Sequence, residues 1–493
     1  MTADPEAVEA PPTLETPEDE DKGVRKVEER MSSDSGGLGD GEDTDSRTRH
    51  GAEHAGDRNT DGSGMLGKVV SRVLTRASTK SSWNPGPPPD GGLKAWTAVI
   101  CAHLVVMDTW GIINSFGLFQ TYYTEALGRA PSDISWIGSV QIFLIFFIGA
   151  LTGRLTDAGY FRHLFVVGAA FQAVGIFTAS VATRYWQVLL AQGICMGLGN
   201  GCMFCPCIAT VSTYFSRKRS LAIGIVACGS ATGGLVFPSM VRQLAPARGF
   251  PSAMRAIGYV QVATLAVVFV FLKPRLKPRK SGPLVEWGAF KEAEYSLYAA
   301  ATFSMFIGLY FAFYYIASFS RDIIGLSYTD SLNLLLVING AGCPGRLIPN
   351  SLADRFGAIN IFVPTAAIAG VCLFCWMAVT STAGLYVWCV SYGMVAGGVQ
   401  SLFPAALSSL TTDLRKAGVR IGMVFTIVSF ATLAGPPISG AIITGSGGEY
   451  YGAQGFAGAA LLLGTAFMAA AKVVKGRKMV AEDKAGSALW AKV

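Results

Sequence analysis

The sequence predicts an all-α polytopic membrane protein with twelve transmembrane helices in two six-helix halves. Three observations predict this class. Only 15% of the 493 residues are charged, against about 25% in a typical soluble domain, and 51% are hydrophobic. After residue 94 the chain consists of apolar segments, each close to the roughly 20 residues that a helix needs to cross a bilayer. The residue pattern of the first half returns in the second half.

The apolar segments divide the chain into regions. We expect the spans at 95–123, 135–156, 163–182, 186–212, 218–241, 254–272, 297–319, 328–349, 360–379, 384–411, 418–443 and 452–475. The predicted domains are an N-terminal tail (1–89), a first bundle (90–272), a linker (273–296), a second bundle (297–475) and a C-terminal tail (476–493).

The distribution of charge predicts an orientation. Residues 1–89 are polar and acidic, end in a proline-rich run and hold no apolar signal-peptide core, so we expect a disordered tail. Loops on the predicted inner side carry most of the Lys and Arg residues, so both termini are expected in the cytoplasm. The expected location is the plasma membrane, with a vacuolar or other endomembrane as the alternative. The net charge of +7 does not predict nucleic-acid binding, because the basic residues are spread over short loops.

An internal repeat supports the division into halves. A shift of 198 positions maps Pro206 onto Pro404 and Gly224 onto Gly422, and a shift of 197 maps residues 153–157 onto 350–354. Repeated halves are typical of transporters that bind their substrate between the halves and expose it to each side in turn.

Two segments carry a family resemblance. Residues 90–96 resemble the signature that opens the first helix in the monocarboxylate porter family of the major facilitator superfamily: Asp90, Gly92 and Trp96 fit it, and Lys94 departs from it. Residues 197–234, which are rich in glycine and contain a basic loop, follow the pattern of the same family. The resemblance covers about 95–475 and implies the major facilitator fold, in a fungal-type member of the family.

A second motif of the superfamily predicts a gate. Gly153 and Asp157 lie in a degraded copy at the end of the second span, and Asp354 and Arg355 lie in a closer copy after the eighth span. Basic residues Arg217 and Arg415 occupy matching loops in the two halves. A carboxylate at a helix end can bind the positive end of a neighbouring helix or an Arg when the inner side closes. The alternative is that these are solvated loop charges.

Arg346, inside the eighth predicted span, is the strongest candidate for substrate binding. A charge within a membrane helix is costly and usually faces a cavity, and Arg can bind a carboxylate through two parallel hydrogen bonds. Asn339 shares its helical face. In the resembled family an Asp four residues earlier pairs with this Arg, but that position is Gly342 here. The alternative is an Arg that extends to the membrane interface.

Three further residues are predicted to contact the substrate. Asn114 stands where the animal porters of the family carry a Lys, so transport of a lactate-like substrate is not implied. Tyr310 and Tyr314 lie one turn apart in an aromatic segment, which predicts a cavity for a larger substrate. Packing between helices is the alternative for these tyrosines.

Asp108 and His103, both in the first span, are the candidates for proton coupling. Burial favours the neutral form of a carboxyl group, and His titrates near neutral pH, so either group can exchange a proton. A hydrogen-bonded structural role is the alternative for each.

These patterns predict a proton-linked secondary transporter for a small organic anion or an acidic secondary metabolite, and an efflux pump is one form of it. An uptake carrier for a monocarboxylate or vitamin, and a nutrient sensor without transport, are the alternatives. The expected partners are a small-molecule substrate, protons and the lipid bilayer. We expect no enzyme activity, nucleotide drive, cofactor, metal site or obligate protein partner, because the chain has no Walker motif and only four His, and its ten Cys lie mostly in apolar spans.

Overall fold

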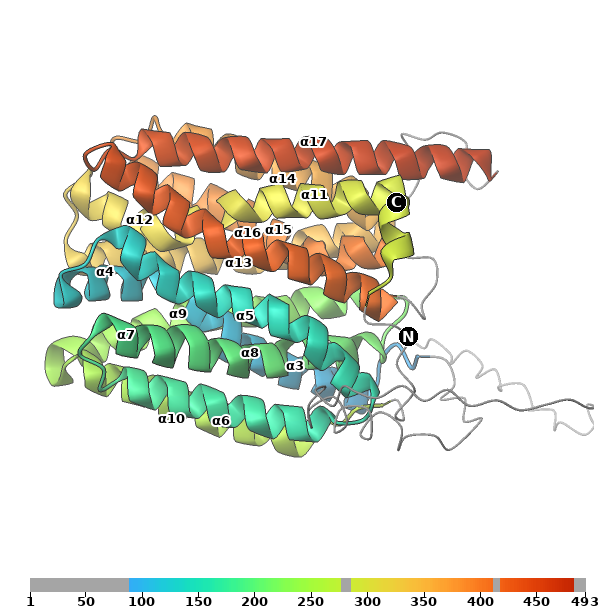
Figure 1. Cartoon of the computed structure of the whole chain (residues 1–493), viewed down its shortest axis with the longest axis horizontal. Helices are drawn as coiled ribbons and strands as arrows, with labels where there is room; N and C mark the ends of the chain where they lie inside the picture. Colours follow the sequence, from blue (N-terminus) through green and yellow to red (C-terminus); the bar gives the residue numbers. More distant parts are fainter. Residues whose placement is uncertain (1–87, 276–284, 411–416, 483–493) are drawn as a thin grey trace, which may run out of the picture. The chain divides into compact units, whose positions relative to one another are not determined.

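The computed structural model describes residues 88–275, 285–410 and 417–482, and helices make up nearly all of these ranges, without a strand. The predicted N-terminal tail, the centre of the linker and the C-terminal tail lie outside the described residues apart from their edges. The helices form two groups that follow the two halves of the chain (Figure 1). The domain bounds themselves stay a prediction.

The first bundle contains six helical runs that are long and apolar enough to cross a membrane. They are α3 (Leu93–Asn114) with α4 (Phe116–Leu127), α5 (Pro131–Asp157), α6 (Phe161–Ala179), α7 (Tyr185–Val188) with η1 (Leu189–Cys195) and α8 (Met196–Ser212), α9 (Arg219–Arg248), and α10 (Phe250–Phe271). Gly128 ends α4 in the left-handed conformation and Pro131 opens α5, between the spans predicted at 95–123 and 135–156.

The second bundle repeats this plan. A short helix η2 (Trp287–Lys291) precedes α11 (Ala293–Leu309) with α12 (Phe311–Asp322), α13 (Tyr328–Phe356), α14 (Ala358–Trp376), α15 (Thr382–Leu410), α16 (Ala417–Gly445) and α17 (Tyr451–Ala481). Counting α3 with α4 and α11 with α12, the described helices make twelve runs at the predicted positions.

Eleven of these runs are both long and apolar enough to cross a membrane, and α13 is the one that is not. Its 29 residues suffice in length, but it buries Asn339, Arg346 and Asn350. These polar groups face the interior of the protein, where α13 packs between α9 and α15, so they do not meet lipid.

The first run of each bundle is broken near its middle, whereas the sequence predicts continuous spans. The break in the first bundle is at Ser115, whose hydroxyl donates to the carbonyl of Gly111 at 2.7 Å. The break in the second bundle is at Tyr310. Discontinuous helices of this kind line substrate sites in transporters built from repeats.

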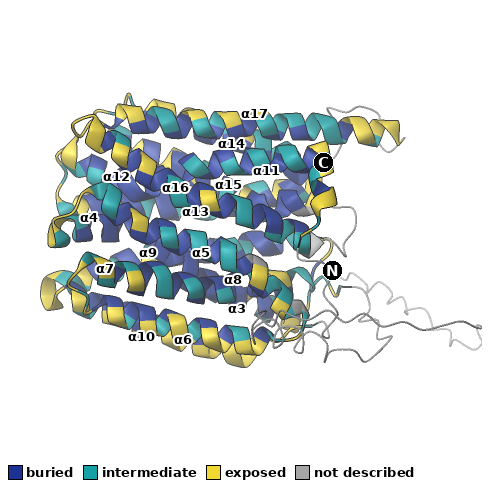
Figure 2. Ribbon diagram, in the orientation of Figure 1, coloured by how far each residue is buried: buried dark blue, intermediate teal, exposed yellow. Residues whose placement is uncertain are grey.

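The bundles meet through two long helix pairs, α9 with α13 and α5 with α16. Figure 2 shows buried residues gathered along this contact and exposed residues on the outer faces of α6, α10 and α17. Large apolar side chains such as Val166, Val174 and Phe271 are among the exposed ones. An apolar outer surface around a buried polar interior is the arrangement that a bilayer requires.

Candidate substrate-binding site

A central cavity of about 50 Å³ lies between the two bundles. Helices α3, α5, α8 and α9 line it from the first bundle, and α11, Tyr310, α13, α15 and α16 line it from the second. The lining side chains are Val106, Trp110, Phe146, Phe204, Ile208, Ile223, Ala227, Ser230, Phe306, Tyr310, Arg346, Gln400, Ser401, Phe403, Pro404 and Phe425. The cavity is far smaller than the roughly 300–1,000 Å³ of a small-molecule site, so it must widen to admit a metabolite.

Arg346 is the one charged side chain of this lining and is only 1% exposed. Its Nη1 donates to the carbonyl of Gly342 at 3.0 Å, and its Nη2 donates to Oε1 of Gln400 at 2.6 Å. Its Nε has no hydrogen-bond partner within the described ranges. None of the ion pairs found there involves Arg346. The cavity wall therefore carries a buried positive charge without a carboxylate to neutralise it.

Gly342 explains how the guanidinium fits. A Cβ at this position would collide with Nη1 of Arg346, so a side chain there would push the guanidinium aside. Because Gly342 has no side chain, the guanidinium can turn back onto its own helix and bond to the Gly342 carbonyl.

Aromatic rings from both bundles form most of the remaining wall. Trp110 of α3 stacks on Tyr310, with ring centroids 6.1 Å apart and an interplanar angle of 19°. The ring of Phe146 of α5 packs against those of Phe403 and Phe425 of the second bundle, with centroid distances of 6.2 and 5.1 Å. These rings come from segments far apart in the sequence, and among them only Tyr310 was predicted as a site residue.

The other predicted substrate residues do not line the cavity. Asn339 donates through Nδ2 to the carbonyl of Asn114 at 3.3 Å, across the contact between the bundles. The side-chain amide of Asn114 is buried and has no partner among the described residues. Tyr314 packs on Phe116 with ring centroids 4.6 Å apart. The structure brings Arg346 and Tyr310 together at the cavity and places Asn114, Asn339 and Tyr314 beyond it.

Neither candidate for proton coupling lines the cavity. The ring nitrogens of His103 lie 2.8 Å from the carbonyl of Ile225 and 3.1 Å from the hydroxyl of Thr232, so His103 ties α3 to α9. Asp108 is fully buried and faces α10, where the hydroxyl of Thr264 lies 2.6 Å from its Oδ2.

Two carboxylates bind the start of α9 at one end of the protein. We call this the basic end, because its loop 213–218 carries Arg217 and Lys218. The turns at 158–160 and at residue 357 belong to the same end. Asp354 of α13 accepts hydrogen bonds from the backbone N–H groups of Ser220 at 3.2 Å and Leu221 at 3.1 Å. These N–H groups belong to the first turn of α9, where the helix dipole favours a negative charge. The contact joins the second bundle to the first.

Asp90 binds the loop immediately before α9. Its carboxylate accepts hydrogen bonds from the backbone N–H groups of Ser216 and Arg217, and its own N–H donates to the carbonyl of Tyr214 at 3.1 Å. The hydrogen bond from Ser216 is the main cause that lowers the pKa of this carboxyl below its ordinary value. Asp90 holds the start of α3 on its own bundle.

The remaining residues of the predicted gate make fewer contacts. Arg217 is exposed and contributes its backbone N–H to Asp90. The guanidinium of Arg355 lies over the ring of Phe356, 5.4 Å from its centroid. A Cβ added at Gly153 would meet nothing within 4 Å. The side chain of Asp157 and the whole of Arg415 lie outside the described residues.

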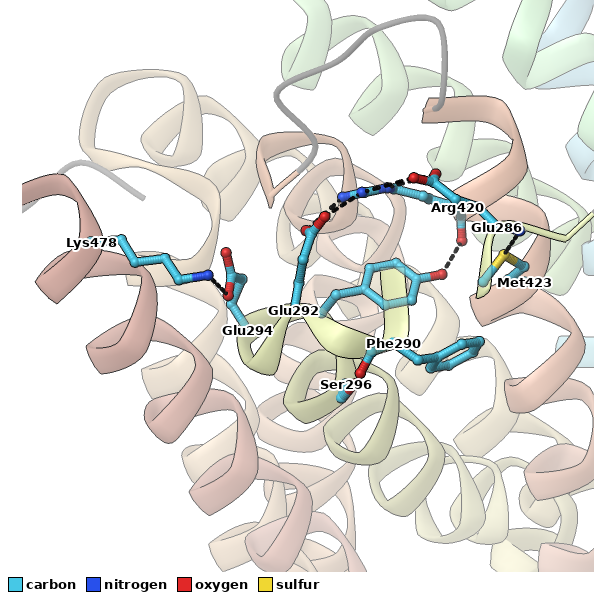
Figure 3. Close-up of polar contacts among 9 residues, drawn as sticks. Glu286, Phe290, Glu292, Glu294, Ser296, Arg420, Met423 and Lys478 are labelled. Atoms are coloured by element: carbon cyan, nitrogen blue, oxygen red, sulfur yellow. Dashed lines mark hydrogen bonds and ion pairs between the residues drawn. The ribbon is translucent and has the colours of Figure 1, made fainter. Parts of the chain in front are cut away.

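An ion-pair cluster that the sequence did not predict stands at the basic end of the second bundle (Figure 3). Arg420 of α16 pairs with Glu286 at 3.2 Å, and its Nη1 donates to Glu292 at 2.8 Å. Lys478 of α17 pairs with Glu294 of α11 at 2.7 Å. The cluster fixes the segment before α11 onto α16 and α17.

Among the residues that the structure describes, no group of three or more His, Cys, Asp or Glu could hold a metal ion.

Comparison with known proteins identifies the family. The profile described as Major Facilitator Superfamily matches residues 99–417. An MFS-type transporter of Gibberella zeae is 56% identical over 78% of this chain and 88% of its own length. The MFS-type transporter dbaD of Emericella nidulans is 40% identical over 72% of this chain and 81% of its own length. The aspyridones efflux protein apdF of Emericella nidulans is 33% identical over 79% of this chain and 80% of its own length.

These relatives cover most of the chain, and the matched region runs through both bundles. The narrower resemblance to monocarboxylate porters stays a prediction. The sequence, the helical fold and the relatives agree that the chain is an integral membrane transporter that belongs to the major facilitator superfamily.

Proposed function

We propose that this transporter exports a small organic anion with an aromatic or otherwise apolar body, and that the anion binds in the central cavity. The observation that carries the proposal is Arg346, a buried guanidinium in the cavity wall without a carboxylate partner. Burying an uncompensated charge costs several kcal/mol. An anionic substrate would offset that cost by supplying the missing counter-charge.

The shape of the guanidinium suits a carboxylate or a similar anion. Its Nε is unpartnered, and Nη2 is held by a single neutral acceptor, Gln400. An anion with two oxygens could bind side-on to Nε and Nη2 through two charge-assisted hydrogen bonds. Gln400 would then exchange its bond to the Arg for one to the substrate.

The aromatic wall supports a substrate larger than a short carboxylic acid. Seven of the lining residues are Trp, Tyr or Phe, and such rings bind planar apolar groups by stacking and edge contacts. The name of the relative apdF specifies efflux of aspyridones, which supports export by this chain. We propose the plasma membrane as its location, with both termini on the cytoplasmic side.

The mechanism we propose is alternating access by relative movement of the bundles. In the described conformation Asp354 holds the first turn of α9, so the basic end of the α9–α13 contact is closed. Release of this carboxylate would let the bundles separate there and would widen the cavity towards the cytoplasm. Gly153, Asp157, Arg217, Arg355 and Arg415 are proposed to assist this gate, and the export is proposed to be driven by protons.

The test is efflux from cells that express Arg346→Ala, loaded with aromatic carboxylates, phenolates and the matching neutral methyl esters. The wild type should lower the cellular level of one or more anions and leave the esters unchanged. Arg346→Ala should slow the efflux at least tenfold, which corresponds to about 1.4 kcal/mol.

Arg255→Ala is the matched control, because this exposed Arg of α10, among the described residues, bonds only within its own turn, to Ser252 at 3.2 Å. It removes one positive charge and should leave efflux unchanged. Equal efflux of acids and esters by the wild type would contradict anion recognition. Unchanged efflux by Arg346→Ala would remove Arg346 from the site.

A further inference from the structure

The first bundle contains a buried carboxylate that the cavity does not use. Asp108 of α3 has no exposed surface. Its neighbours along the helix, Val106 and Trp110, line the cavity, whereas Asp108 points to the other side of α3, towards α6 and α10. Gln172 of α6 and Gln261 of α10 surround it: both donate through Nε2 to its backbone carbonyl, at 2.8 and 3.0 Å.

The cluster has more acceptors than donors. Asp108 Oδ1, Gln172 Oε1 and Gln261 Oε1 are buried, and no described hydrogen-bond donor reaches any of them. Thr264 is 2.6 Å from Oδ2 of Asp108, but its hydroxyl also lies 2.9 Å from the carbonyls of Val260 and Gln261. One hydroxyl proton can serve only one of these three acceptors. A buried acceptor without a donor is costly, so the cluster lacks at least one hydrogen.

The cluster also lacks a positive charge. No described Lys, Arg or His pairs with Asp108, and α6, α8, α9 and α10 bring no charged or titratable side chain to act on its carboxylate. His103, on the same helix, is turned to α9, where both of its ring nitrogens are bonded. An ionised, unpaired carboxylate at this depth would be strongly unfavourable. A proton on Asp108 removes the charge and adds a donor in one step.

We propose that Asp108, Gln172, Gln261 and Thr264 form a proton-binding site inside the first bundle, separate from the substrate cavity, and that this site carries the proton that drives transport. Asp108 is the group that binds the proton. One of the two glutamine oxygens accepts the O–H of the neutral acid, and Thr264 donates to the carboxylate when the proton has left.

The position of Asp108 on α3 explains how the site would act on the substrate. Val106 and Trp110 are four residues apart and face the cavity, and Trp110 stacks on Tyr310 of the other bundle. Asp108 lies between them on the opposite side of the helix. Loss of its proton would place a charge between α3, α6 and α10, and α3 would shift to let water reach it. Such a shift moves the cavity wall. This coupling rests on the proposed function, because it requires transport of an anion.

The site is tested by infrared spectroscopy, independently of transport. Purified wild-type protein should show the carbonyl band of a protonated carboxylic acid in difference spectra recorded across a pH range. Asp108→Asn should lose this band, whereas Asp330→Asn, which changes an exposed carboxylate at the start of α13, should keep it. If Asp108→Asn does not fold, Asp108→Glu should shift the band. A spectrum unchanged by the Asp108 variants would overturn the proton site.

The coupling is tested in proteoliposomes with an imposed pH gradient and, separately, a sodium gradient. Wild-type flux should follow the pH gradient, and Asp108→Asn should transport without responding to it. Wild-type flux that follows only the sodium gradient, or a response to pH retained by Asp108→Asn, would overturn the coupling. A protein with the infrared band but without flux would keep the proton site and reject the proposed function.

Discussion

The two long contacts between the bundles are made from different kinds of residue. In the α9–α13 contact, small and polar groups meet: a Cβ at Gly224 would lie 3.0 Å from the carbonyl oxygen of Arg346, and Asp354 bonds to the first turn of α9. In the α5–α16 contact, aromatic rings meet over part of the length: the ring centroids of Phe143 and Phe147 lie 5.3 and 6.3 Å from that of Phe430. Gly440 of α16 also packs closely on the backbone of Ser132 of α5.

This difference assigns the contacts different roles in a moving transporter. Hydrogen bonds and close backbone packing are directional and are lost within a small displacement, so the α9–α13 contact is expected to select between discrete states. Aromatic rings can slide past each other with little loss of contact area, because no hydrogen bond has to break. The α5–α16 contact is therefore expected to keep the bundles together while they rotate.

The largest effect is expected from adding volume to the α9–α13 contact. Gly224→Leu places a side chain against the Arg346 carbonyl and Asn350, whose Cβ is only 3.2 Å from a Cβ at position 224. Overpacking of this kind costs about 1–3 kcal/mol, so closure at the basic end and efflux should fall tenfold or more. Phe147→Leu replaces a ring in the α5–α16 contact by a smaller apolar side chain and should alter efflux by less than about twofold. Equal loss in the two variants would contradict the division of roles.

The next effect is expected from a covalent bond across the same contact. Cys228 of α9 and Cys343 of α13 are both free, and the thiol of Cys228 lies 3.6 Å from the carbonyl of Cys343. Oxidation by diamide should join them: the two thiols give up two protons and two electrons and form a disulfide. Efflux should then stop and return with dithiothreitol.

Electrophoresis checks the position of this bond. With a protease site inserted in the predicted linker 273–296, the two halves should stay joined after cleavage under non-reducing conditions. Cys343→Ser should abolish both effects. Halves that separate after oxidation of the wild type would show that α9 and α13 do not approach closely in the membrane.

A smaller effect is expected from Asp354→Asn. The variant keeps an acceptor but removes the charge that strengthens its bonds to the N–H groups of Ser220 and Leu221. A charge-assisted hydrogen bond contributes about 1.5–3 kcal/mol when buried, and less here because the site is partly exposed. Efflux should fall several-fold, and hydrogen–deuterium exchange should quicken in the first turn of α9. Glu449→Gln, which changes an exposed carboxylate, should alter neither the efflux nor the exchange in α9.

The sequence predicted the parts of this architecture that local physics determines. The bilayer fixes the length of a span, so the twelve runs lie where apolar segments predicted them. The cost of burying a charge pointed to Arg346, which lines the cavity. The breaks at Ser115 and Tyr310 were missed, because neither residue is a strong helix breaker. Trp110 and Gln400 were also missed, because only the packing of distant helices brings them to the cavity that Arg346 lines.

The smallest effect is expected at Asp90. This carboxylate binds the loop before α9 from within the first bundle, whereas Asp354 binds α9 from the second bundle, so the two variants can be compared directly. Its lowered pKa means that the carboxylate is ionised near neutral pH, and its bonds to Ser216 and Arg217 weaken only as the pH falls through that lowered value. Asp90 has a positive φ of 50°, a conformation that Asn tolerates. Asp90→Asn should therefore change efflux by less than about twofold, and Asp90→Ala should quicken exchange at residues 216–217. An efflux defect of Asp90→Asn as large as that of Asp354→Asn would contradict this order. It would mean that efflux depends on holding the loop before α9 in place, and not on the contact of Asp354 between the bundles.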